Sequence, residues 1–472
     1  NQKKPFIHLL TKTLSKQMGD SFKELLKDQQ LALNVIKEEE YSFLKTLEQG
    51  LIILEDVINN SVERKISGDK VFELYDTFGF PFDLTALIAN EKGYKIDQEG
   101  FDIEMEKQKT RSRKASLLKT GDWILLNDSK KEEFIGYDKL KSKIKILRYR
   151  KITTTKEGNF FHLVFDKTPF YPEGGGQLGD KGFIESSNGN IFRIFNTKKE
   201  NNLLIHFCKT LPNKLESTFK AVVDSNNRHR TSCNHTATHL MHQALRSILG
   251  SHVEQKGSMV NSGIFRFDFS HYSKLNEEEL RKVEQFVNER IREKIPLNEY
   301  RDFDYNDALK KGAIALFGEK YGDKVRVIQF DQSIELCGGT HVSNTSEIWY
   351  FKIISETSVA SGIRRIEAIT GDTAKKYFEE QTQLLESIKD ILNKTQEPLK
   401  AIENIKNENT NLKKDIIFLS KLKLQVLKSE LIKDFENISG IQFLVREVEL
   451  NFKEIKEISF EIGSAIKNSI II

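Results

Sequence analysis

Two histidines one helical turn apart are the first side chains in this sequence that could do chemistry. His235 and His239 follow Thr231, a residue that caps helices well, and precede Gly250, at which the predicted helix ends. Residues i and i+4 lie on the same face of a helix, so both imidazoles can reach one metal ion. His242 falls within the same arc, away from the apolar stripe. A single histidine is usually structural or solvated, but a clustered pair favours metal binding.

A cysteine and a histidine far downstream could complete the set. Cys337 and His341 enclose a pair of glycines, which lets the backbone bend between them. Three imidazoles and one thiolate match the ligands of a tetrahedral zinc site. The pattern leaves open a closed structural site and a catalytic site with a displaceable ligand. Thr236 stands directly after His235, where a zincin protease carries a glutamate, which argues against a metalloprotease.

Length and composition predict a soluble protein of several domains. The chain has 472 residues, of which 38% are hydrophobic and 30% are charged, enough for several packed cores. Its 73 Lys+Arg and 69 Asp+Glu residues leave a net charge of +4. A nucleic-acid surface would therefore have to come from local clustering of basic residues.

Cysteine usage and the absence of membrane and signal segments predict the cellular compartment of the protein, and the chain ends predict a fragment. Cys208, Cys233 and Cys337 are odd in number and far apart, which argues against a disulfide framework and for a reducing compartment. No stretch is apolar and long enough for a membrane helix and no signal peptide opens the chain, so we expect a cytoplasmic protein with no membrane contact. The chain begins at Asn1 without Met and ends on an apolar run, so we expect a fragment of a longer protein.

Changes in hydrophobic period predict a multi-domain α+β fold with five segments. These are a helical domain (1–119), a small β-barrel (120–223), an α+β domain with the zinc site (224–372), a coiled coil or helical hairpin (373–436) and the start of a truncated domain (437–472). Apolar residues from Ile402 to Val426 alternate three and four positions apart, as in a heptad seam. Pairing with another chain and packing within this chain are equal alternatives.

Several stretches resemble one family, in the same order along the chain. NHTATHLMHQALRSILGSHVEQKGSMV together with CGGTHV resembles the editing domain of alanyl-tRNA synthetase, and GDKVFELYDTFGFPFDLT, PFYPEGGGQLGD and SGIRRIEAITG resemble further stretches of that enzyme. The resemblance covers almost the whole chain and is weak only at its end. It implies a helical tRNA-recognition region, an editing domain with zinc and the beginning of the family's C-terminal domain.

Class II aminoacylation motifs, including an arginine-bearing glycine-rich strand for ATP, are not found in the sequence. We therefore interpret the chain as the C-terminal part of an alanyl-tRNA synthetase, with ATP and magnesium needed only in a missing aminoacylation domain. The chain is then expected to recognise tRNA(Ala) and to hydrolyse Ser-tRNA(Ala) and Gly-tRNA(Ala), because a pocket for alanine rejects serine and glycine poorly. Alternatives are a non-catalytic tRNA-binding module with structural zinc and a free-standing deacylase. A homodimer through the C-terminal region is a further hypothesis.

The resemblance also implies roles for residues outside the zinc set. Thr238 and Gln255 would hydrogen-bond the serine hydroxyl, which alanine lacks. Arg364 and Arg365 are adjacent on a predicted strand and point to opposite faces. We assign Arg364 to the ester and Arg365 to the tRNA, an order that the sequence leaves open. Asp69 would help to read the acceptor stem, with helix capping as the alternative.

A glycine-rich run, Gly174 to Gly179, formally fits the dinucleotide-binding fingerprint. Turn and strand residues follow it in place of a helix, so we reject a Rossmann site. Gly175-Gly176-Gln177 also resembles the tripeptide with which peptide release factors approach a tRNA ester, which makes Gln177 a candidate catalytic residue. A simple hairpin turn is equally favoured.

Overall fold

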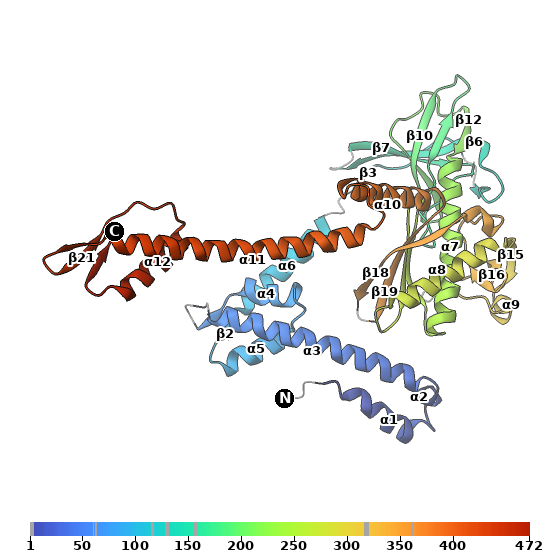
Figure 1. Ribbon diagram of the computed structural model, residues 1–472. Coiled ribbons are helices and arrows are strands. Elements are labelled where there is room, and N and C mark those ends of the chain that lie inside the picture. Colours follow the sequence, from blue (N-terminus) through green and yellow to red (C-terminus); the bar gives the residue numbers. More distant parts are fainter. Residues whose placement is uncertain are drawn as a thin grey trace. The chain divides into compact units, whose positions relative to one another are not determined.

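The computed structural model describes residues 4–59, 61, 64–114, 118–127, 132–154, 158–315, 321–360 and 362–472. They form a multi-domain α+β protein, as predicted, with two compact units, Asn1–Lys376 and Tyr377–Ile472. Figure 1 shows the elements in chain order. Within the described ranges, no helix has the length and apolarity needed to span a bilayer.

The first part of the chain is mostly helical and packs around a small core. Leu54, Leu74 and Phe80 are fully buried there. A Cβ on Gly50 would lie 2.0 Å from the ring of Phe80, so only glycine lets this ring pack against the helix. The elements are η1 (Ile7–Leu9), α1 (Leu10–Met18), α2 (Lys23–Lys27), α3 (Gln29–Asn59), β1 (Lys65–Ile66), α4 (Gly68–Asp76), α5 (Phe82–Glu91), β2 (Lys95–Ile96) and α6 (Gln98–Lys114).

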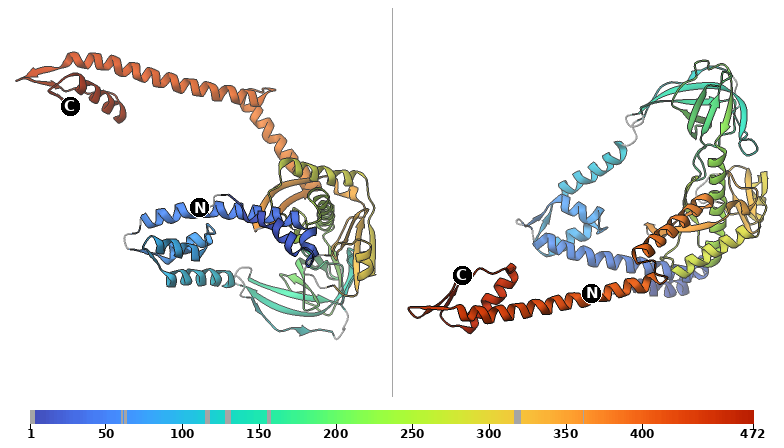
Figure 2. Two further views of the ribbon diagram at one scale, coloured as in Figure 1. Left: turned by 90° about the horizontal axis from the view of Figure 1, so that it is seen from below. Right: turned by 45° about the horizontal axis from the view of Figure 1, so that its top comes forward.

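Six antiparallel strands close into a barrel, which confirms the predicted small β-barrel. Their order is β12–β9–β10–β11–β7–β6, and β6 also pairs with β12. Both views in Figure 2 show these strands, teal to green, curling around one another. Alternate residues of β12 (Phe219, Ala221 and Val223) are buried, as a strand with one face on the core requires. The strands of this region are β3 (Leu118–Thr120), β4 (Ile124–Leu125), β5 (Glu133–Phe134), β6 (Lys141–Thr154), β7 (Gly158–Phe165), β8 (Lys167–Thr168), β9 (Gly182–Glu185), β10 (Ile191–Glu200), β11 (Leu203–Cys208) and β12 (Thr218–Val223).

Helices and two sheets follow the barrel. The antiparallel sheet β13–β14–β19–β18 packs with α7 and α8 around a core in which Phe265, Phe267 and Phe269 are fully buried. A second antiparallel sheet, β15–β16–β17, packs with α9. The elements are α7 (Ser225–Leu249), β13 (Gln255–Val260), β14 (Phe265–Ser270), α8 (Glu277–Arg292), β15 (Asn298–Asp304), α9 (Tyr305–Lys310), β16 (Lys324–Phe330), β17 (Ser333–Leu336), η2 (Thr345–Ile348), β18 (Phe351–Ala360) and β19 (Ile363–Thr370).

Helix α7 starts at Ser225, so the predicted start at Thr231 is wrong. Asp224 caps the helix, because its carboxylate accepts a hydrogen bond from the backbone N–H of Asn227 at 3.0 Å. The first turns are polar and give no apolar period, which hid them from the sequence analysis. The end at Leu249 is as predicted, since Gly250 follows it with φ +121°.

A buried arginine ties the start of α7 to the barrel. Arg228 forms an ion pair with Asp180 and donates to the carbonyl oxygens of Gly136 at 2.6 Å and Pro169 at 2.9 Å. Both members of the pair are almost completely buried. Because a buried charge is costly without partners, these contacts fix the helix to the barrel loops.

The second unit contains a long helix and a small sheet. On α11 the residues of the predicted seam, including Ile405, Leu412 and Leu419, are exposed in the single chain. Pairing through this seam stays a prediction, as do the five segment boundaries. The elements that run through and beyond the unit boundary are α10 (Gly371–Ile391), α11 (Pro398–Leu431), η3 (Ile432–Asp434), β20 (Glu436–Ile438), β21 (Ile441–Leu444), α12 (Phe452–Ala465) and β22 (Ser469–Ile471).

Removing one member of the buried pair should destabilise the first unit. Asp180→Ala leaves the guanidinium of Arg228 buried and unpaired, which should lower the free energy of unfolding by about 3–5 kcal/mol. Glu173→Ala is the control, because its pair with Lys198 is exposed and should contribute about 1 kcal/mol or less. Urea unfolding followed by circular dichroism measures both. Equal effects of the two substitutions would contradict this role of Arg228.

Candidate metal centre

The four residues that the sequence singled out as metal ligands meet in one place. His235 and His239 come from α7, and Cys337 and His341 come from the loop after β17. Each offers one ligand atom, and these atoms all lie within 4.8 Å of one another. Cys337 Sγ lies 3.5 Å from His235 Nε2 and 3.3 Å from His341 Nε2. Two segments far apart in the sequence thus surround a volume that one ion can fill.

A glutamine fixes the protonation of His235. The side-chain oxygen of Gln177 accepts a hydrogen bond from the backbone N–H of Thr340 and lies 2.8 Å from His235 Nδ1. This acceptor oxygen requires a donor at Nδ1, so the lone pair of His235 is on Nε2, the nitrogen nearer to Cys337. Burial holds the pKa of His235 well below its ordinary value, so the ring is neutral near pH 7. Neutral imidazole is the form that binds metal ions.

The other two imidazoles are also held neutral. Burial holds the pKa of His341 well below its ordinary value and lowers the pKa of His239. His341 Nδ1 lies 3.1 Å from the hydroxyl of Thr236. Among the described residues, His239 Nδ1 has no hydrogen-bond partner although it is buried, which costs about 1–3 kcal/mol. The residues therefore fit a metal ion. Their donor atoms are of the right type, the imidazoles are neutral, and one buried ring nitrogen lacks a partner that a metal ion could supply.

A buried carboxylate supports the helix side of the cluster. Glu335 Oε2 lies 3.5 Å from His239 Nε2, and its Oε1 lies 3.0 Å from His242 Nδ1. Burial alone would raise the pKa of Glu335, but His239 and His242 outweigh it and lower that pKa. Glu335 thus orients His239, as carboxylates commonly do behind metal-binding histidines. It also engages His242, which lies beside the cluster without joining it.

An arginine and a tyrosine hold the loop after β17. Arg326 donates to the carbonyl oxygens of Cys337 at 2.9 Å and Gly339 at 2.6 Å. Its guanidinium lies 4.0 Å from the ring centroid of Tyr137, whose hydroxyl donates to the carbonyl oxygen of Gly338. Three successive carbonyl groups of the loop are therefore fixed from outside the cluster.

A cleft of about 350 Å³ reaches the cluster at His341. Ser232, Thr340 and Arg326 line it, and the hydroxyl of Ser232 donates to that of Thr340 at 2.9 Å. Its volume is in the range of sites for small organic ligands. The cluster therefore has a polar space beside it in which a substrate group could be held.

The glycine-rich run forms a tight hairpin turn, the structural alternative that we predicted beside a catalytic role for Gln177. Gly174 and Gln177 exchange backbone hydrogen bonds at 3.1 and 3.0 Å. Gly175 and Gly176 have φ of +56° and +79°, and this kind of turn needs positive φ at both positions. The turn inserts the buried side chain of Gln177 beside His235, where it supports the ring. Its predicted catalytic role stays a prediction.

The two residues predicted to contact the serine hydroxyl do not line this cleft. Thr238 is buried within α7, and its hydroxyl donates to the carbonyl oxygen of Asn234 at 2.8 Å. Gln255 is half-buried at the start of β13. The structure therefore brings neither residue to the part of the cluster next to His341, and their roles stay predictions.

The two adjacent arginines of β19 engage carboxylates within the sheet. Arg364 Nε donates to Glu356 at 2.6 Å, and Arg365 forms a double hydrogen bond with Asp268 at 2.6 and 2.8 Å. Both arginines therefore support the sheet, a role that we expected for only one of them. Asp69 is exposed in the first turn of α4, where a carboxylate also stabilises the helix end. Substrate or tRNA contacts of these three residues stay predictions.

Three residues that orient the ligands were not predicted from the sequence: Glu335, Thr340 and Arg326. Glu335 and Thr340 lie in the same ELCGGTH run as Cys337 and His341, so this run already held the signal. Arg326 gave no local signal. It reaches the loop because β16 pairs with β17, so that the backbone N–H of Cys337 donates to the carbonyl oxygen of Arg326.

Two family models match the chain. The model described as "tRNA synthetases class II (A)" matches residues 1–228, and the model described as "Threonyl and Alanyl tRNA synthetase second additional domain" matches residues 325–367. The second match contains Cys337 and His341. His235 and His239 lie between the two matches.

Relatives match along nearly the whole chain. The alanine–tRNA ligase of Christiangramia forsetii is 57% identical over 472 residues, which cover 100% of this chain and 54% of that protein. The alanine–tRNA ligase of Flavobacterium psychrophilum is 51% identical over 478 residues, with the same coverage, and that of Porphyromonas gingivalis is 44% identical over 474 residues, which cover 99% and 53%. The chain spans about half the length of the curated relatives it matches.

The class II match corrects one interpretation of the sequence. We interpreted the chain as a C-terminal part beyond the class II region, with no aminoacylation expected from it and with ATP and magnesium confined to a missing domain. This is wrong, because the class II model matches nearly the first half of the chain, from residue 1 to residue 228. The interpretation relied on a few short motifs, whereas the family signal extends over helices and barrel strands that carry no such motif.

Gly339 offers a test of whether the cluster binds zinc. A Cβ at this position would lie 2.0 Å from Cε1 and 2.3 Å from Nδ1 of His235. Gly339→Ala should therefore displace the ring from Gln177 and lower zinc affinity by about 10- to 100-fold. Competition with a chromogenic chelator measures this affinity. Gly338→Ala is the matched control, because its Cβ would meet only the hydroxyl of Tyr137 at 3.9 Å; equal affinities of both variants would contradict the proposed site.

Proposed function

We propose, from the premise that this chain belongs to the alanyl-tRNA synthetase family, that the cluster of His235, His239, Cys337 and His341 binds zinc and serves editing. Editing is the hydrolysis of the ester bond between a wrong amino acid and its tRNA. The observation that carries this proposal is the convergence of four ligand atoms within 4.8 Å beside a polar cleft.

Zinc is the ion that this donor set supports best. Three neutral imidazoles and a cysteine sulfur are soft or borderline ligands, and their number suits tetrahedral geometry. With one of the four ligands displaced, zinc there would polarise an ester carbonyl or lower the pKa of a water molecule. Gln177 and Glu335 hold two of the imidazoles in fixed orientations, which strengthens metal binding.

The chain's own side chains would hold the ester and select the amino acid. Ser232 and Thr340 offer hydroxyl groups in the cleft, and Arg326 keeps the ligand loop rigid. We propose Thr238 and Gln255 as partners of a serine hydroxyl. A site built around such hydrogen bonds discriminates against alanine, because alanine leaves the buried polar groups unpaired.

For the whole ligase we propose the attachment of alanine to tRNA(Ala) with ATP and magnesium, as class II membership implies. Since the chain spans about half of its relatives, this activity and the tRNA partner are proposals for the whole protein. Asp69 and Arg365 are the residues that we propose as tRNA contacts. We also propose that the whole protein is located in the cytoplasm.

Loss of a ligand should abolish editing. We expect Cys337→Ala and His239→Ala to lower kcat/KM for hydrolysis of Ser-tRNA(Ala) by at least about 100-fold, because zinc no longer supports the ester. Release of labelled serine from mischarged tRNA measures the rate, and elemental analysis of the same samples measures zinc.

The matched control is Cys208→Ser in the barrel. The Cys208 thiol donates to the carbonyl oxygen of Thr210 at 3.0 Å, a bond that a serine hydroxyl can also make. This variant should keep both zinc and activity. Full hydrolysis by folded Cys337→Ala protein that lacks zinc would contradict a role of the metal in editing.

A further inference from the structure

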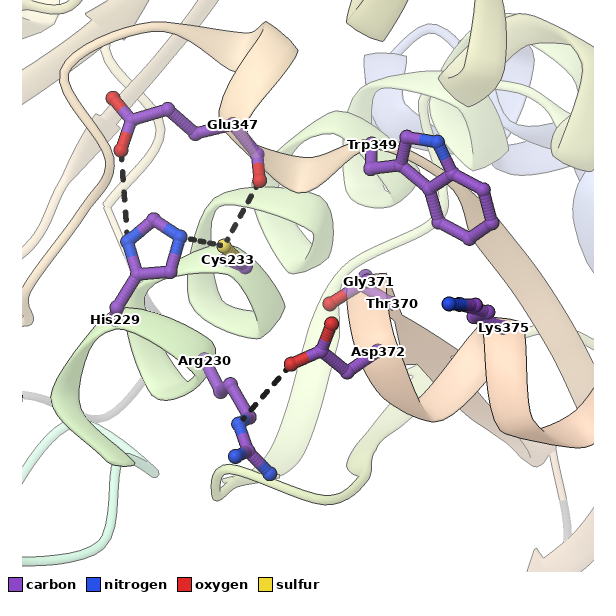
Figure 3. A pocket seen from close by; sticks show the side chains of 9 residues that line it. All are labelled: His229, Arg230, Cys233, Glu347, Trp349, Thr370, Gly371, Asp372 and Lys375. Atoms are coloured by element: carbon purple, nitrogen blue, oxygen red, sulfur yellow. Dashed lines mark hydrogen bonds and ion pairs between the residues drawn. The ribbon is translucent and has the colours of Figure 1, made fainter. Parts of the chain in front are cut away.

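A second pocket, of about 300 Å³, lies next to the cleft of the cluster. It is formed by the early turns of α7, the end of η2 and the start of α10 (Figure 3). His229 and Glu347 line both this pocket and the cleft that reaches His341. The two spaces are therefore adjacent, with His229 and Glu347 in the wall that they share.

A strained tryptophan forms one side of the pocket. Trp349 has φ +64° and ψ −62°, and the N–H of Tyr350 donates to the carbonyl oxygen of Ile348 at 2.8 Å across it. This is a three-residue turn with positive φ, a rare conformation for a bulky residue. Trp349 nevertheless stays 56% exposed. Strain that leaves a large aromatic ring exposed in a pocket points to a binding role.

Positive groups lie opposite and beside this ring. Arg230 and Lys375 line the pocket together with Asp372 (Figure 3). Arg230 Nε is 3.7 Å from Asp372 Oδ2, and the two side chains are 48% and 79% exposed. Such a long, exposed pair contributes little to stability, so the guanidinium can exchange the carboxylate for a phosphate.

The thiol in the pocket wall does not indicate a nucleophilic centre. Cys233 Sγ lies 3.7 Å from His229 Nε2 and 3.5 Å from the carbonyl oxygen of Glu347. The side chain is only 3% exposed, and burial raises the pKa of Cys233 to about 12. Cys233 is therefore a neutral wall residue, and the groups that a ligand can reach are the ring and the cations.

We infer that this pocket binds a nucleotide of single-stranded RNA whose base stacks on Trp349 and whose phosphate contacts Arg230 and Lys375. Aromatic rings and basic side chains are the combination that binds single strands without reading base edges. The inference rests on the proposed function for the identity of the strand, the 3′ end of tRNA. The shared wall would then lead its terminal aminoacyl group into the cleft at His341.

Fluorescence of Trp349 gives a direct test that needs no catalysis. The chain has two tryptophans, so Trp123→Phe leaves Trp349 as the single reporter. An RNA hexamer ending in CCA should quench this emission in a saturable manner. A blunt RNA duplex, whose bases are already stacked on one another, should quench it at least about 10-fold more weakly. Equal quenching by the duplex, or an unchanged spectrum with the hexamer, would overturn the inference.

Charge variants test the phosphate contact by anisotropy of the labelled hexamer. Arg230→Ala should weaken binding and lower the slope of log K against log salt by about 0.7, whereas Asp372→Asn should tighten binding. Trp349→Gly, which removes the ring and suits positive φ, should weaken binding by about 10-fold or more. Changes in the same direction for Arg230→Ala and Asp372→Asn, or none for Trp349→Gly, would overturn the inference.

The two proposals fail in different ways. Wild-type protein that binds the hexamer but does not hydrolyse Ser-tRNA(Ala) contradicts editing and supports the RNA pocket. Protein that hydrolyses Ser-tRNA(Ala) normally, with hexamer binding indifferent to Trp349→Gly, overturns the pocket and supports editing.

Discussion

The site depends on one carboxamide oxygen that joins three elements. The side-chain oxygen of Gln177, at the end of a barrel hairpin, lies within hydrogen-bond distance of His235 on α7 and of the backbone N–H of Thr340 in the ligand loop. Because Gln177 is fully buried, its polar atoms find their partners only within the protein. The barrel, the helix and the loop therefore hold their relative positions through the same atom that sets the protonation of His235.

Burial and neutrality reinforce each other around the cluster. Burial keeps the imidazoles uncharged, and uncharged rings tolerate close packing with one another. Glu335 is a buried carboxylate beside these rings. Its contacts with His239 and His242 offset the cost of burying its negative charge. A cation at the cluster would add positive charge where this carboxylate and the Cys337 sulfur already lie, so the buried charge of Glu335 favours it.

The sequence predicted those parts of the site that short spacings encode. The helical interval of His235 and His239 and the glycine bend between Cys337 and His341 need only local geometry, and so does the hairpin that carries Gln177. Their meeting was expected from chemistry alone, because three imidazoles and a thiol suit one ion. Arg326 could not be predicted, since its contact with the loop exists only through the pairing of β16 with β17. The start of α7 was wrong because Asp224, which caps it, precedes any apolar period.

The wall between the two pockets shows how local and distant constraints combine. Glu347 belongs to a capping box at η2: its carboxylate accepts from the backbone N–H groups of Ser343 and Asn344. The same residue lies 3.6 Å from His229 through its carboxylate and 3.5 Å from Cys233 through its carbonyl oxygen. The capping box orders η2 itself, and the contacts of Glu347 with His229 and Cys233 hold η2 against α7. Trp349 follows this anchored segment directly, so the segment also fixes the position from which its exposed side chain lines the pocket.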